Sequence, residues 1–87
     1  MALVRIPPVE ARVRWDRAAD RPSSIRWSGG TLQVVDLDAV RDERAAFPAD
    51  RGPRVTYLLR IADGGRASVV FDGRRGRWYV EAIERAA

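Results

Sequence analysis

Hydrophobic and charged residues alternate along the first part of the chain. Val9, Ala11, Val13 and Trp15 fall on one face, and the charged residues between them fall on the other. A period of two is typical of a β-strand with one buried face. The pattern therefore predicts a strand that begins at Val9.

A hairpin is predicted next. The run Asp16 to Ser23 reads as a loop, because it is rich in proline, serine and aspartate. Ser24 to Ser28 then forms a strand, Gly29-Gly30 permits the positive φ angles of a tight turn, and Thr31 to Leu37 returns. The two tryptophans of this half, Trp15 and Trp27, are expected in the core, with their arginine neighbours pointing outward.

The pattern changes between residues 38 and 53. Apolar residues among charged ones suit one or two helical turns over Asp38 to Phe47, with Asp38 as N-cap. Pro48 to Pro53 reads as an exposed loop, because two prolines and a glycine continue neither a helix nor a strand ladder.

The last third predicts a three-stranded meander. Arg54 to Ile61, Arg66 to Asp72 and Arg77 to Ile83 each alternate, and glycine-rich turns separate them. Glu81 to Ala87 is also compatible with a final helical turn, since its residues are good helix formers.

These elements predict a mainly β fold with a short helical turn or loop near residues 38–53. Five to six short strands with tight turns suit a small antiparallel barrel or a curled sheet of the SH3 or OB kind. Closure also hides strand edges that would otherwise invite aggregation. With 87 residues, we expect residues 1–87 to form a single small β domain.

Composition removes many chemistries. The chain has no cysteine and no histidine, and all 16 basic residues are arginine, so thiol, imidazole and lysine chemistry are absent. Asp36, Asp38, Asp42 and Glu43 cluster, but arginines among them favour a salt-bridged strand end over a metal site. We expect no enzyme, no cofactor, no metal and no small-molecule substrate.

No apolar run is long enough to span a bilayer, and the first residues lack the apolar core of a signal peptide. The sequence therefore predicts a cytoplasmic protein without membrane contact.

Positive charge gathers in the C-terminal third. The formal net charge is +4, and residues 51–79 hold seven arginines but two acids, whereas residues 1–50 hold eight of each. Guanidinium groups bind phosphates bidentately, and aromatic rings stack on bases. The sequence thus predicts a face that binds nucleic acid, or a protein that processes nucleic acid, at these arginines: Arg54, Arg60, Arg66, Arg74, Arg75 and Arg77. A solvated outer face with Trp78 in the core would give the same pattern.

A second hypothesis uses the same sheet without nucleic acid. Leu58, Val70 and Tyr79 fall on the face opposite the expected core. Such a patch, or a strand edge, would bind a protein partner or a second copy of the chain as a homodimer.

Two stretches resemble a small all-β family of actinobacteria and the Deinococcus-Thermus group. They are Arg21 to Gly30, with Arg-Pro followed by Arg-Trp-Ser-Gly, and Tyr57 to Ile83, with Gly-Arg-Trp-Tyr-Val near its end. The last hairpin is also similar to the C-terminal tail of ImuB-type relatives of Y-family DNA polymerases. The resemblance covers about half the chain, and the chain departs from the family pattern over Asp38 to Pro53. It implies an accessory domain that binds, without catalysis, in DNA repair or mutagenic synthesis.

Overall fold

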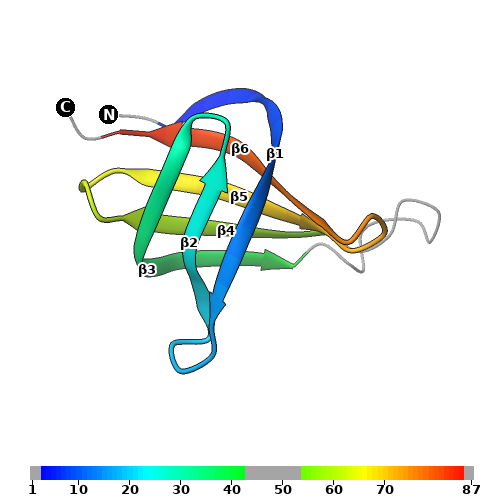
Figure 1. Cartoon of the computed structure of the whole chain (residues 1–87), viewed down its shortest axis with the longest axis horizontal. Coiled ribbons are helices and arrows are strands. Elements are labelled where there is room, and N and C mark those ends of the chain that lie inside the picture. The colour runs from blue at the N-terminus through cyan, green and yellow to red at the C-terminus, as the bar shows by residue number, and fades with distance from the viewer. Residues whose placement is uncertain (1–2, 43–53, 86–87) are drawn as a thin grey trace.

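Six β-strands follow one another along the residues that the computed structural model describes, which are 3–42 and 54–85 (Figure 1). They are β1 (Val4–Asp16), β2 (Arg21–Trp27), β3 (Gly30–Asp42), β4 (Arg54–Ile61), β5 (Arg66–Asp72) and β6 (Arg77–Glu84). They close into one antiparallel barrel in the order β1-β2-β3-β4-β5-β6. The prediction of a small antiparallel β-barrel is confirmed.

The strand order is a simple meander. Each strand pairs with its neighbour in the chain, and β1 pairs with β6 to complete the ring. This strand order differs from the Greek-key order of an OB fold, although neither barrel leaves a long open sheet edge.

Two long strands make closure possible, because each is shared between two neighbours. β1 pairs with β6 through Val4 to Ala11 and with β2 through Arg12 to Asp16. β3 pairs with β2 up to Gln33 and with β4 from Val34 onward. Register shifts interrupt both strands, and such bulges bend a strand and increase its twist. Figure 1 shows the result: β1, β2 and the first part of β3 cross steeply over β4, β5 and β6.

Arg21 bonds β2 to β3 where the two strands separate. Its guanidinium donates to the Val34 carbonyl at 3.2 Å, to the Val35 carbonyl at 3.1 Å and to the Pro22 carbonyl at 3.1 Å. These carbonyls lie beside the end of the β2–β3 ladder, so the side chain supplies donors where strand pairing ends.

The core lies between the two crossed layers. Ile25, Leu59, Val69 and Val80 are fully buried, one from each of β2, β4, β5 and β6. They form one cluster with further small and branched residues: Ala11, Leu32, Val34, Ile61 and Ala67. Alternation along each strand produces this core, as the sequence pattern predicts.

Two turns depend on their glycines. Gly30 has a φ of 123° after the two-residue turn that joins β2 to β3, a region that other residues rarely adopt. Gly65 precedes β5, and a Cβ built there would lie 1.9 Å from the carbonyl oxygen of Glu84. The β4–β5 turn therefore packs directly on the backbone at the end of β6.

Two expectations about the elements are corrected. Asp38 to Asp42 is strand rather than helix, because its backbone pairs with β4, and tertiary pairing overrides weak helix propensity. Residues 43–53, which include Phe47 and the Pro48–Pro53 loop, lie outside the described residues. Glu81 to Glu84 also continues β6 instead of turning into a helix, since it pairs with β5.

The first strand also begins earlier than expected, at Val4. Pro7 and Pro8 sit where the β1–β6 register shifts between Arg5 and Val9. A bulge tolerates residues that have no N–H to donate. Within the described residues, no helix is long and apolar enough to cross a membrane.

Replacing Leu59 with alanine should lower the free energy of unfolding by about 2–5 kcal/mol, because it leaves a cavity that the strands fill only in part. Urea unfolding followed by circular dichroism measures the change. Val35→Ala is the control, at a position that is 51% exposed, and should cost less than about 0.5 kcal/mol. Equal losses from the two variants would contradict the core assigned here.

Candidate nucleic-acid interface

The six arginines predicted from the sequence all lie on the outside of the layer formed by β4, β5 and β6 (Figure 1), which we call the second layer. Arg54 and Arg60 are on β4, Arg66 begins β5, and Arg77 begins β6. Arg74 and Arg75 occupy the turn between β5 and β6. The barrel brings Arg60 and Arg66 directly opposite each other on adjacent strands, as expected for a basic stripe on a sheet.

Most of these charges are compensated by neighbouring carboxylates. Ion pairs join Arg54 to Glu81, Arg60 to Asp38 (3.1 Å), Arg66 to Glu84 (2.9 Å), Arg75 to Asp72 (3.9 Å) and Arg77 to Glu10 (3.6 Å). The acids come from β1, β3, β5 and β6, and most are distant from their partners in sequence. A phosphate that approached this face would compete with them.

Arg74 and Arg75 of the predicted set lie in the β5–β6 turn, where both are exposed. The Asp72 carboxylate accepts from the backbone N–H groups of Arg74 and Arg75 and so shapes the turn. The Arg74 side chain has no carboxylate partner among the described residues. The pKa of Arg75 is raised, chiefly by a side-chain hydrogen bond with Tyr79.

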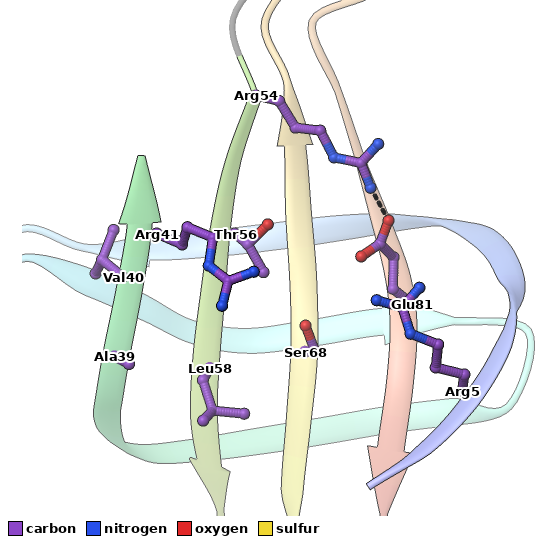
Figure 2. A pocket seen from close by; sticks show the side chains of 9 residues that line it. All are labelled: Arg5, Ala39, Val40, Arg41, Arg54, Thr56, Leu58, Ser68 and Glu81. Atoms are coloured by element: carbon purple, nitrogen blue, oxygen red, sulfur yellow. Dashed lines mark hydrogen bonds and ion pairs between the residues drawn. The ribbon is translucent and has the colours of Figure 1, made fainter. Parts of the chain in front are cut away.

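A hollow of about 500 Å³ opens on the outer face of the same layer, and we call it the bowl. Figure 2 shows its floor of Thr56, Leu58 and Ser68 between two groups of charged side chains. Arg41 lies on one side, and Arg5, Arg54 and Glu81 lie on the other; Ala39 and Val40 complete the lining. The bowl is basic, but the carboxylate of Glu81 already binds one of its guanidinium groups.

The residues of the alternative protein interface share this outer face. Leu58 lines the bowl, and Val70 lies opposite Tyr79 on the next strand. Val70 is 2% exposed, whereas Leu58 and Tyr79 are half-buried. The three side chains therefore expose little continuous apolar surface.

The acidic cluster does not converge. Asp38 pairs with Arg60, and Asp36 accepts from the N–H of Leu37 at 2.8 Å. Glu43 lies outside the described residues. In the part of the chain that the structure describes, no group of three acidic residues is placed to hold a metal ion.

A different set of arginines lacks such compensation. Arg12 on β1 lies directly opposite Arg26 on β2, and Arg14 follows on the same face of β1. All three are exposed, and no carboxylate of residues 3–42 or 54–85 makes an ion pair with them. Like charges directly opposite on paired strands destabilise a sheet. We call this set, with the neighbouring hydroxyls of Ser24 and Thr31, the arginine face.

Two hollows flank the Arg12–Arg26 pair. One, of about 430 Å³, is lined by the whole arginine face together with Val13. The other, of about 420 Å³, is lined by both arginines, Glu10 and Trp27, with Ala11 and Ser28. The Glu10 carboxylate is engaged, since it lies 3.6 Å from Arg77. Guanidinium groups with two nearby hydroxyls form a donor set suited to an anion.

Sequence reasoning missed this face for an identifiable reason. The first 50 residues have no net charge, which directed attention to the C-terminal third. The alternation does place Arg12, Arg14 and Arg26 outward, but only the β1–β2 register sets two of them opposite each other. The two acids of β1 are engaged elsewhere: Glu10 lies 3.6 Å from Arg77, and the Asp16 carboxylate accepts from the N–H groups of Ala18 and Ala19.

Comparisons with family models, with curated proteins and with solved structures find no significant match to this chain. The candidate interface therefore stands on its geometry.

Replacing Arg26 with glutamine should raise the free energy of unfolding by a few tenths of a kcal/mol, on the order expected for a cross-strand charge pair, because it removes the repulsion from Arg12. The gain should shrink as salt is added. Urea unfolding at low and high ionic strength measures both effects.

Arg66→Gln is the matched control, because Arg66 also faces an arginine across strands but is paired with Glu84. It should lower stability or leave it unchanged. If Arg26→Gln destabilised the barrel as much as Arg66→Gln does, Arg26 would have a compensating partner. The arginine face would then not differ from the second layer in its ion pairing.

Proposed function

We propose that this barrel is a non-enzymatic module that binds the phosphate backbone of nucleic acid on its arginine face. The observation that carries the proposal is the uncompensated opposition of Arg12 and Arg26, next to Arg14. A phosphate bound between them would turn a repulsive arrangement into an attractive one.

The contrast with Arg60 and Arg66 supports this choice of surface. Both pairs place two arginines opposite each other on adjacent strands. Arg60 and Arg66 each have a carboxylate within 3.1 Å, and the arginine face has none among the described residues. Binding a phosphate there displaces no internal ion pair.

The arginines predicted from the sequence have a secondary part in the proposal. Glu10, which lines a hollow with Arg12 and Arg26, forms an ion pair with Arg77 at the start of β6. The exposed Arg74 and Arg75 lie in the turn just before Arg77. Backbone contacts of this kind give affinity without sequence preference. An accessory role in DNA repair or mutagenic synthesis, which the resemblance implies, belongs to this proposal and is compatible with binding of that type.

Fluorescence anisotropy with labelled single- and double-stranded DNA and RNA, across a salt series, tests the proposal. The unmodified protein should bind more weakly as salt rises, with a linear log–log slope. The double variant Arg12→Gln/Arg26→Gln should weaken binding and reduce the slope by roughly 1.4 to 1.8, as expected for the loss of two phosphate contacts.

The double variant Arg60→Gln/Arg66→Gln is the control, because it removes the same charge from the same cross-strand arrangement. It should reduce the affinity and the slope less than the first double variant does. Equal losses would indicate a response to net charge rather than a site, and the absence of binding at low salt would refute the proposal.

A further inference from the structure

Four aromatic residues gather at the end of the barrel where β1 finishes, and we call them the aromatic end: Trp15, Tyr57, Phe71 and Trp78. The ring centroids of Trp15 lie 5.9 Å from those of Tyr57 and 6.4 Å from those of Trp78. Trp78 in turn contacts Tyr57 at 5.4 Å and Phe71 at 5.0 Å. Trp15 is therefore held by neighbours from β4 and β6.

Trp15 is not a core residue, contrary to the sequence expectation. It is 39% exposed, whereas Tyr57 and Trp78 are partly buried and pack against the core cluster. Its ring planes make angles of 77° with Tyr57 and 37° with Trp78, so neither ring stacks parallel on it. Among the described residues, no parallel aromatic ring occupies the indole face.

The surroundings of Trp15 continue this apolar surface. Val40 lies opposite Tyr57 in the β3–β4 register, hence on the same side of the sheet, and it is 49% exposed. Tyr57 thus has the partly exposed Trp15 in ring contact and the exposed Val40, which also borders the bowl, opposite it on β3. An indole that is fixed in place yet open on part of its surface loses little conformational entropy when a planar ligand stacks on it.

The aromatic end adjoins the arginine face. Arg14 immediately precedes Trp15, and the two side chains leave β1 on opposite sides. The described β1–β6 pairing ends at Ala11 and Trp78, so β6 does not cover the edge of β1 beside Arg12 to Trp15. A flexible polyanion on the arginine face can cross this edge and reach the indole.

We propose that the ligand is single-stranded nucleic acid, with its phosphates on the arginine face and one of its bases stacked on Trp15. This inference rests on the proposed function and adds the strandedness of the ligand. The positive charge beside the aromatic end favours a nucleic acid over an uncharged apolar partner. A duplex keeps its bases stacked inside, whereas a single strand presents them to aromatic side chains.

The test compares two ligands of equal charge. One is an oligothymidine of roughly 16 nucleotides, the upper end of the site size of small β-barrel modules; the other is an abasic phosphodiester chain of the same length. The Trp15→Leu variant should weaken oligothymidine binding roughly five-fold to one hundred-fold and leave abasic binding unchanged. Trp15→Phe should retain most of the affinity, because it keeps an aromatic face.

The two proposals fail in different ways. If both ligands bind equally and Trp15→Leu alters neither, while Arg12→Gln/Arg26→Gln weakens both, base stacking is refuted and backbone binding stands. If neither ligand binds at low salt, both proposals fail. If Trp15→Leu weakens both ligands equally, the indole acts through the fold, and stacking is again refuted.

Two further arms address strandedness and the competing occupant of the aromatic end. The first arm compares duplex DNA with oligothymidine and duplex RNA with oligouridine. A duplex that binds as tightly as the single strand of the same kind would overturn the inference. Sedimentation of the unmodified protein and of Trp15→Leu should give the same mass for both. Suppose instead that the unmodified protein is a dimer, that Trp15→Leu is a monomer, and that oligothymidine and the abasic chain bind with equal affinity. The aromatic end would then be the contact with a second copy of the chain.

Discussion

The division of β1 and β3 between two partners each is the constraint on which the rest of the structure depends. Each strand is 13 residues long and bends at register shifts, so its two halves belong to the two crossed layers. This arrangement lets six strands in simple meander order close around a core of small branched residues. It also separates β1 from β6 beyond Ala11, and this separation is where Trp15 meets the aromatic residues of the other layer.

The electrostatics of the barrel follow from the same geometry. On the second layer, acids from neighbouring strands form ion pairs with the arginines of β4, β5 and β6, and the side chains of Glu81 and Glu84 are only 14% and 16% exposed. Each such pair occupies a guanidinium that would otherwise bind an anion. On β1 and β2 the register places Arg12 against Arg26, and among the described residues no carboxylate forms an ion pair with either, since the nearby Glu10 pairs with Arg77. Net charge by segment therefore locates the arginines but not the charges that remain available.

The arginine face and the aromatic end have complementary chemistry. One offers charged donors without internal acceptors, and the other offers an anchored indole that is partly open to solvent. Both involve positions near the end of β1, where alternation sends consecutive side chains to opposite sides of the strand. A ligand that contacts both would combine negative charge, flexibility and an aromatic group, as the unpaired polynucleotide that we propose does.

Much of this architecture can be predicted from the sequence, because apolar and polar residues alternate along a strand that has one buried face. The alternation at Val9 to Trp15 and from Arg54 to Ile83 determined the strands, and the glycine-rich turns determined the antiparallel class. The sequence pattern did not determine the secondary structure of Asp38 to Asp42. A short charged segment has no strong local preference, and pairing with β4 decides its conformation. Nor did the pattern determine which arginines are neutralised, because Arg60 meets Asp38 and Arg54 meets Glu81 only across strands. Composition and periodicity are local properties of the chain, whereas ion pairing and the exposure of Trp15 depend on register and barrel closure, which only the tertiary structure decides.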